Sequence, residues 1–217
     1  MHTEEVKIDA VVFDLGKVLI DYDFNRAIQG AARLANLPPA DVRQRLLGEG
    51  HFFDFECGHL SGPEFHGKVQ TMLDCAIPYD TFCELWNCIF IGEIEPTVAL
   101  FLALQQRSDL KVGILSNTNA LHFEHVRQNM SGLVRLREMK HVYASHQIRC
   151  RKPGAPCYQL VLKNMEVRAE RCVFIDDMAE NIASAEALGM HGIHATSPEA
   201  VRLGLQKLGL AGMAIGC

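Results

Sequence analysis

The sequence predicts an α/β protein, a Rossmann-like doubly wound parallel sheet with an inserted helical domain. Short apolar runs rich in β-branched residues recur along the chain, and stretches with helical spacing separate them. Strands that alternate with helices favour a parallel sheet with right-handed crossovers and helices on both faces. After the first apolar run, residues 24–94 contain no convincing strand, which predicts a helical insertion.

The first strand is expected at residues 6–13, an apolar run that stops at Asp14 as a buried parallel strand would. Similar runs predict four more strands, at 110–115, 141–144, 171–175 and 191–195. Helices are expected between the strands, at 97–107, 119–129, 155–166 and 179–188.

The insertion is predicted to be helical throughout. Ser61 and Glu64 have the spacing of a capping box, with a proline between them, so a helix is expected to begin there. No linker separates the insertion from its neighbours. We therefore expect residues 23–94 to form a cap domain that packs as a lid on a core domain of residues 1–22 and 95–217.

The composition is that of a soluble globular protein. Apolar residues make up 48% of the 217 residues and charged residues 22%, which excludes a disordered chain. The net charge of -5 comes from mixed acids and bases without a Lys/Arg run, so we expect no nucleic-acid partner.

The eight cysteines include no C-x-x-C pair, and reduced thiols are expected. Residues 1–9 lack an apolar signal segment, and no window approaches the roughly 20 apolar residues of a membrane span. We expect a cytoplasmic protein without a membrane partner. The apolar segment 208–217 fits a frayed tail, a packed segment or a subunit contact, and the choice between monomer and homodimer stays open.

Polar residues at the ends of the predicted strands are the candidates for chemistry, because open parallel sheets bind ligands at the carboxyl ends of their strands. They are Asp14 and Gly16 after the first strand, Ser116 and Asn117 after the second, Asp176 and Asp177 after the fourth, and Lys152 before the helix at 155. Together they supply the carboxylates, hydroxyl and ammonium that hold a divalent cation and a phosphate.

The chain resembles the haloacid dehalogenase superfamily, whose four motifs appear in order as FDLGKV, LSNT, RKP and FIDDMAEN. The resemblance spans nearly the whole chain, and the insertion falls where that superfamily carries a helical cap. The motifs are similar to a branch near glucose-1-phosphate phosphatase and the phosphatase domain of soluble epoxide hydrolase. The resemblance implies a Mg²⁺-dependent phosphatase of a small phosphorylated metabolite, with a sugar phosphate as one candidate.

The resemblance also implies a nucleophile and a metal site. Asp14 is expected to form an aspartyl-phosphate, with a cation offsetting its repulsion from the anionic substrate. The implied Mg²⁺ ligands are Asp14, the backbone carbonyl of Gly16 and one member of the Asp176 and Asp177 pair. Asp177 is favoured as the direct ligand, because its four-residue spacing to Asn181 matches the family's fourth motif, and Asp176 as a ligand through water.

The phosphoryl group is expected to be held by Ser116 and Lys152, with help from Asn117. Each has a plainer interpretation. Ser116 and Asn117 could cap the helix at 119, just as the two aspartates could cap the helix at 179 and Asp14 could form a turn. Lys152 before a proline could be an exposed surface residue.

Gly16 departs from the pattern of the superfamily's phosphatases, which carry a second Asp there to protonate the leaving alcohol. Such general acid catalysis is usually worth ~10² to 10⁴ in rate. Three hypotheses follow. The leaving group is comparatively acidic, as in an anomeric sugar phosphate or an acyl phosphate, and needs less protonation. A lid residue such as His51, Asp54 or Glu56 donates the proton instead. Alternatively, the protein is slow or inactive as a phosphatase.

His59, His66 and Trp86 join the three lid residues as candidates for substrate contact, although amphipathic helices place such residues outward by default. Lys17 is expected to be an exposed side chain with no role in the site. The alternative is that it makes a second contact to the phosphate.

Two other functions remain open. A 2-haloacid dehalogenase would use the same Asp14 to attack carbon without a metal, but those relatives carry a Tyr at the position of Gly16. The acid pair is also better suited to a cation. The second alternative is a catalytically weak protein that binds a phosphorylated ligand.

Overall fold

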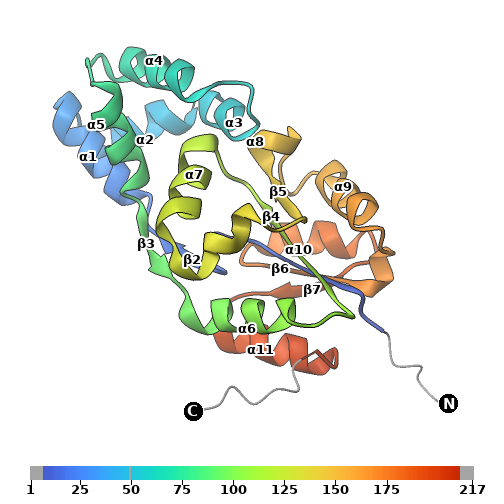
Figure 1. Ribbon diagram of the computed structural model, residues 1–217. Coiled ribbons are helices and arrows are strands. Elements are labelled where there is room, and N and C mark those ends of the chain that lie inside the picture. The colour runs from blue at the N-terminus through green and yellow to red at the C-terminus, as the bar shows by residue number, and fades with distance from the viewer. Residues whose placement is uncertain (1–6, 49, 211–217) are drawn as a thin grey trace.

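The computed structural model describes residues 7–48 and 50–210. Its centre is a parallel sheet with the strand order β5-β4-β1-β6-β7 (Figure 1). The strands are β1 (Ala10–Phe13), β4 (Lys111–Ser116), β5 (Val142–Ala144), β6 (Cys172–Asp176) and β7 (His191–His194). All four neighbouring pairs are parallel, so the predicted sheet and its five strands are confirmed.

Both faces of the central strands β1 and β6 are buried, which is why these two strands are nearly continuous apolar runs in the sequence. Successive side chains of a strand point to opposite faces. Val11 and Phe13 accordingly belong to one hydrophobic cluster, and Ala10 and Val12 belong to another.

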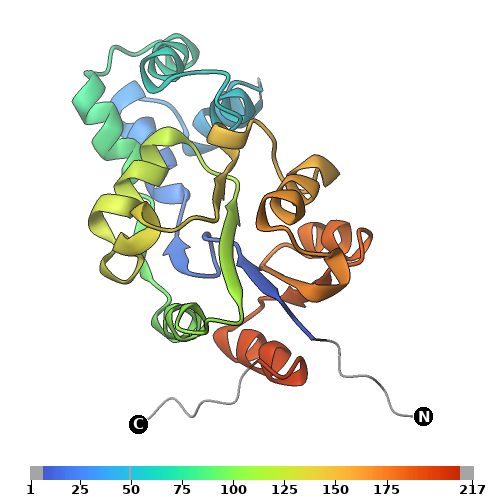
Figure 2. The same cartoon turned by 45° about the vertical axis from the view of Figure 1, so that its right-hand side comes forward.

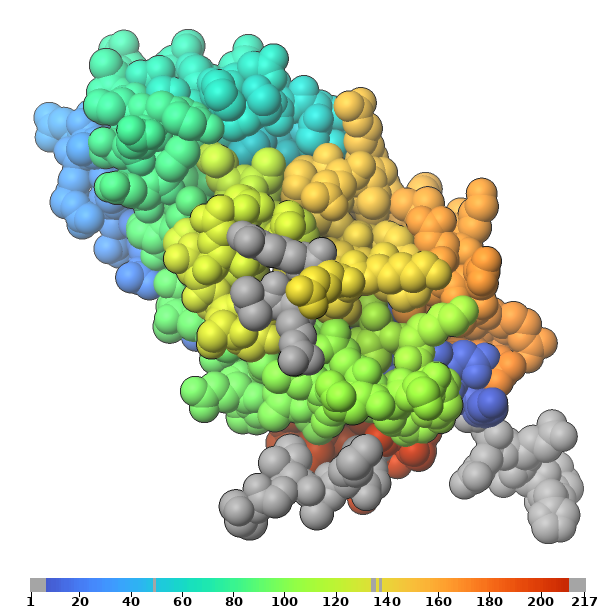
Figure 3. Space-filling view, in the orientation of Figure 1, coloured from blue at the N-terminus to red at the C-terminus, as the bar shows by residue number. Residues whose placement is uncertain are grey.

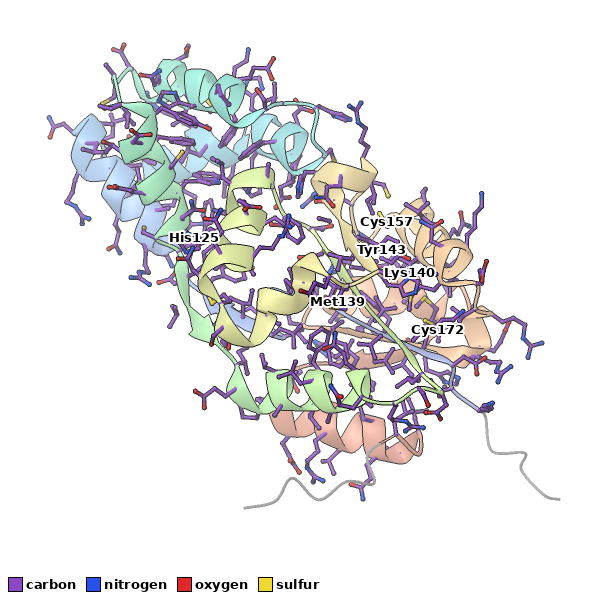
Figure 4. The ribbon with its side chains drawn as sticks, viewed as in Figure 1. His125, Met139, Lys140, Tyr143, Cys157 and Cys172 are labelled. Atoms are coloured by element: carbon purple, nitrogen blue, oxygen red, sulfur yellow. The ribbon has the colours of Figure 1, made fainter. Side chains whose placement is uncertain are left out.

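Helices supply the other half of each cluster. The face of Phe13 is covered by α6 (Glu95–Gln105), α7 (Ala120–Asn129), η1 (Ser131–Arg137) and α11 (Pro198–Lys207). The opposite face is covered by α8 (Ser145–Ile148), α9 (Ala155–Met165), η2 (Ala169–Arg171) and α10 (Ala179–Glu186). Figure 2 shows α7 and α9 on opposite sides of β4. Tyr143, Cys157 and Cys172, labelled in Figure 4, belong to the second of these clusters.

Five helices between β2 and β3 have a hydrophobic cluster of their own; we call them the cap helices. They are α1 (Asn25–Ala35), α2 (Pro39–Gly48), α3 (His51–Glu56), α4 (Gly62–Leu73) and α5 (Tyr79–Asn87). The predicted capping box is confirmed, because Ser61 accepts from the backbone of Glu64 while the Glu64 side chain accepts from the backbone of Ser61. The cap helices form one end of the molecule, where α5 contacts α7 and α3 contacts α8 (Figure 3).

The two segments that connect the central sheet with the cap helices pair as an antiparallel hairpin. β2 (Ile20–Tyr22) lies beside β3 (Phe90–Glu93), with an irregularity between Asp21 and Tyr22. The expectation that residues 24–94 contain no strand is therefore wrong at β3. That strand is short, carries Gly92 and pairs with residues about seventy positions away, so no local periodicity announces it.

The described cysteines, from Cys57 to Cys172, are free thiols. Within the described residues, no helix is long and apolar enough to cross a membrane. Residues 211–217, most of the apolar C-terminal segment, lie outside the described part of the chain, as do residues 1–6.

Candidate active site

The polar residues at the ends of β1, β4 and β6 meet at one cavity of about 520 Å³, which the cap helices also line. Asp14, Gly16, Ser116, Asn117, Lys152 and Asp177 all contribute to its wall. Asp176 lies just beneath, fully buried at the end of β6. The parallel sheet thus brings the residues selected from the sequence together.

Lys152 is the central cation of the site. Its side chain is 1% exposed, and Nζ lies 2.8 Å from Oδ1 of Asp14 and 2.6 Å from Oδ2 of Asp176. Asn117 holds its backbone, donating from Nδ2 to the Lys152 carbonyl at 2.9 Å and accepting from the Lys152 N–H at 2.9 Å. The interpretation of Lys152 as an exposed surface residue is therefore wrong.

The three aspartates Asp14, Asp176 and Asp177 form a cluster that fits a metal ion. One carboxylate oxygen from each lies within 4.8 Å of the others. Burial raises the pKa of Asp14 from 3.8 to about 6, against the lowering effect of Lys152. Burial also raises the pKa of Asp177. Carboxylates whose charge is disfavoured in this way gain most from a cation, and a hard cation prefers oxygen ligands.

The two members of the acid pair differ in their surroundings. Oδ1 of Asp176 accepts from Nδ2 of Asn181 at 2.9 Å and from the N–H of Met178 at 2.8 Å, while Oδ2 faces Lys152. Asn181 therefore contacts Asp176, although its spacing drew attention to Asp177. Asp177 lines the cavity and is half-buried.

The plainer capping interpretation fails for Ser116 and Asn117 but holds in part for Asp176, whose Oδ1 accepts from the N–H of Met178 at the start of α10. Asn119 is the N-cap of α7 and accepts from the backbone of His122, so Ser116 and Asn117 are not its caps. The N-cap of α10 is Met178, which has no side-chain capping bond. Asp14 does make a local bond, accepting from the N–H of Leu15 at 2.7 Å.

Gly16 lies against Tyr22. A Cβ added to Gly16 would be 2.8 Å from Cε1 of the Tyr22 ring, so the ring occupies the space of the missing side chain. Burial, and next the charge of Asp14, raise the pKa of Tyr22 to about 12. Lys17 is partly exposed, as expected, and pairs with Asp21 at 2.6 Å.

Of the lid candidates, Glu56 lines the cavity. Glu56 is buried, and its Oε2 lies 2.7 Å from the guanidinium of Arg151. Arg151 lies outside the cap helices and is not among the site residues predicted from the sequence. Burial raises the pKa of Glu56, while Arg151 lowers it. The carbonyl of Glu56 also accepts from Oγ of Ser145 at 2.6 Å, a second link between α3 and the core.

The other lid candidates do not line the cavity. Asp54 and His59 face each other on the surface at 3.5 Å. His66 bonds the carbonyl of Ile77 at 2.7 Å, and Trp86 is buried in the cluster of the cap helices. His51 is also absent from the lining.

Comparison with known proteins agrees with this architecture. The sesquiterpene phosphatase astK of Aspergillus oryzae is 34% identical over 221 residues, which cover 96% of this chain and 97% of that protein. The D-ribitol-5-phosphate phosphatase of Bacteroides thetaiotaomicron is 26% identical over 84% of this chain and 89% of its own length. A haloacid dehalogenase family enzyme from Bacteroides thetaiotaomicron, solved with magnesium and inorganic phosphate, superposes with a TM-score of 0.77 at 23% identity, covering 85% of this chain and 92% of that one.

The family model for haloacid dehalogenase-like hydrolases matches residues 8–189, most of the chain. The matched segment contains the strands that carry the site and all the cap helices. The chain belongs to the haloacid dehalogenase-like hydrolases.

Proposed function

We propose that the chain is a Mg²⁺-dependent phosphatase that hydrolyses a small phosphate monoester through an aspartyl-phosphate on Asp14. The observation that carries this proposal is the position of Lys152 Nζ, 2.8 Å from Asp14 and 2.6 Å from Asp176, on the wall of a cavity that also holds Asp177. The Lys152 ammonium is suited to bind the phosphate of a substrate, and the neighbouring carboxylates are suited to bind the cation that accompanies it.

The reaction takes two displacements. A carboxylate oxygen of Asp14 attacks phosphorus, the ester P–O bond breaks, and the leaving oxygen takes a proton. Water then attacks the phosphorus of the aspartyl-phosphate, which releases inorganic phosphate and restores Asp14. Lys152 and Ser116 hold the phosphoryl oxygens, and Asn117 fixes Lys152 through its two backbone bonds.

Asp14, Asp177 and the carbonyl of Gly16 would hold the Mg²⁺, with Asp176 behind them. The ion would neutralise the charge between carboxylate and phosphate. Asp176 is less suited to direct ligation, because both of its oxygens accept hydrogen bonds from the protein. Its part in this proposal is to hold Lys152 and to add negative charge.

Glu56 is the group we assign to the leaving oxygen, in place of an acid at Gly16. Among the three lid residues considered as donors, it lines the cavity, whereas His51 and Asp54 do not. Burial raises its pKa by more than Arg151 lowers it, and this direction favours the protonated form that a general acid needs. With this assignment, residues 23–94 act as a cap domain that completes the site of a core domain formed by residues 1–22 and 95–217.

The test is a measurement of phosphate release from acetyl phosphate and from a panel of phosphorylated metabolites, with Mg²⁺ and with EDTA. Mg²⁺-dependent release supports the proposal. Chloride released from a 2-haloacid in the presence of EDTA would instead identify a dehalogenase. Tight binding of a phosphorylated ligand without either product would identify a binding protein.

A further inference from the structure

We propose that the organic group of the substrate is apolar, so that the enzyme acts on alkyl, aryl or isoprenoid phosphate monoesters rather than on polyhydroxylated ones. This inference rests on the proposed phosphatase function and concerns the part of the cavity beyond Asp14. The observation behind it is the chemistry of the wall that the cap helices and the β2–β3 hairpin present to that space.

Apolar side chains dominate this wall. They include Phe24, Leu47, Phe52, Phe53, Phe90 and Met178. They come from the cap helices and their connections, from β3 and from the loop after β6, so several elements contribute to the wall. The rings of Phe24 and Phe52 pack edge to face at 5.7 Å, which holds the aromatic surface in one arrangement.

His122 is one polar residue of this wall, and both of its ring nitrogens are occupied. Nε2 lies 2.9 Å from the carbonyl of Trp86, and Nδ1 lies 3.0 Å from Nδ2 of Asn119. The tautomer that satisfies both donates from Nε2 and accepts at Nδ1. Burial lowers the pKa of His122 to about 4, so the ring is neutral. It offers the cavity an aromatic surface and no free hydrogen-bonding atom.

Three polar side chains of the wall, Arg43, Glu56 and Arg151, contact protein groups. Glu56 and Arg151 pair at 2.7 Å, and the guanidinium of Arg151 lies over the ring of Phe53 at 4.4 Å from its centre. Arg43 donates to Oδ1 of Asn25. A sugar or polyol would bury several hydroxyls against these surfaces, and hydroxyls buried without partners are unfavourable. A hydrocarbon group has no such requirement.

Two apolar side chains lie partly exposed beside the cavity. Phe53 on α3 and Met178 after β6 are each 47% exposed, and they approach the cavity from the cap and from the core. Exposed apolar side chains that border a concave pocket are typical of ligand contact. A volume of about 520 Å³ accommodates a ligand of drug size.

The test compares straight-chain alkyl phosphates from ethyl to octyl with ribitol 5-phosphate and glucose 1-phosphate, all with Mg²⁺. Burial of each added methylene should raise kcat/KM roughly fourfold until the cavity is filled. Octyl phosphate should then exceed both polar substrates. A flat response to chain length, or a preference for either polar substrate, would overturn the inference.

Acetyl phosphate separates this inference from the proposed function. If it is hydrolysed and the alkyl series is flat, the phosphatase proposal stands and this inference fails. If no substrate is hydrolysed, the phosphatase proposal fails, and calorimetry with the same alkyl phosphates tests the cavity directly. Affinity that rises with chain length would then support the apolar site, and constant affinity would refute it.

A matched pair of variants locates the effect. Phe53→Asn and Leu34→Asn each replace an apolar side chain of the cap helices that is about half exposed, 47% and 48% respectively. Phe53 lines the cavity and Leu34 does not. Phe53→Asn should reduce the octyl-to-ethyl ratio of kcat/KM about tenfold, and Leu34→Asn should leave that ratio unchanged. Equal ratios in both variants would count against this wall as the contact surface.

Discussion

The ring of Tyr22 occupies the space in which a side chain on Gly16 would lie. A Cβ on Gly16 would approach Cε1 of Tyr22 to 2.8 Å, closer than such atoms come in proteins. Gly16 is therefore matched to a tyrosine contributed by β2 of the hairpin. The packing of the Tyr22 ring therefore leaves no room for an acidic side chain two residues after Asp14.

Gly16→Ala should lower the free energy of unfolding by about 1–3 kcal/mol, because its new methyl group overlaps the Tyr22 ring. Much of this loss should vanish in the Tyr22→Ala background, giving a coupling energy of about 0.5–3 kcal/mol in a double-mutant cycle. Urea denaturation measures all four proteins. Gly67→Ala is the control: this helical glycine has open space around its Cβ and should gain about 0.5–1 kcal/mol. Strictly additive losses would contradict the overlap.

Asp14 should make the metal-free protein less stable as pH rises. Its pKa is 3.8 when unfolded and about 6 when folded, so the folded state binds the extra proton between these values. Stability therefore falls from about pH 4 to about pH 6, and the penalty stays constant above. The variant Asp14→Asn does not carry this penalty, because its side chain does not ionise. In EDTA, the advantage of Asp14→Asn in unfolding free energy should grow across this window to on the order of 3 kcal/mol. A difference that is independent of pH would contradict the raised pKa.

Lys152→Met should destabilise the metal-free protein by about 3–5 kcal/mol, because two buried carboxylates lose their cation. Saturating Mg²⁺ should recover part of this loss by binding the folded state. Thermal or urea unfolding with and without Mg²⁺ measures both effects. Lys68→Met, an exposed substitution on α4, should change stability by no more than about 0.5 kcal/mol. Equal stability of the two variants would contradict a role for Lys152 as the cation that stabilises Asp14 and Asp176.

Glu56→Gln should slow substrates according to their leaving group. An alkyl phosphate needs its leaving oxygen protonated, so kcat should fall roughly 10² to 10⁴-fold. Acetyl phosphate, whose leaving group is far more acidic, should lose much less. Steady-state phosphate release measures the ratio, with Asp54→Asn of the same helix as the control. Equal losses on both substrates would assign Glu56 a structural role through Arg151.

The central sheet and the residues at its edge follow from local signals. Apolar runs in the sequence predict β1, β4 and β6. The carboxyl ends of parallel strands meet at one edge of the sheet. Asp14, Ser116 and Asp177 could thus be placed at a common cavity from sequence alone. The burial of Lys152 could be anticipated only through the order of motifs, because a lysine before proline is ordinarily exposed.

What could not be predicted depends on contacts between distant segments. Glu56 and Arg151 are about ninety-five positions apart in the sequence. Helical periodicity predicts whether a residue faces inward, but it does not predict which distant residue that side chain contacts. The same holds for β2 and β3, whose pairing requires the cap helices to fold between them. The overlap of Tyr22 with Gly16 joins residues only six positions apart, but it depends on the turn between them, in which Gly16 forms a bridge with Ile20, and no periodicity predicts that turn.

The most direct test of the central claim is the turnover number of Asp14→Asn, measured as phosphate release from acetyl phosphate at saturating Mg²⁺. If Asp14 takes the phosphoryl group, the wild-type protein releases phosphate, EDTA abolishes the release, and the variant loses several orders of magnitude in kcat. Circular dichroism and Mg²⁺-free unfolding should show the variant folded. Phosphate release by folded Asp14→Asn at the wild-type rate would contradict the mechanism.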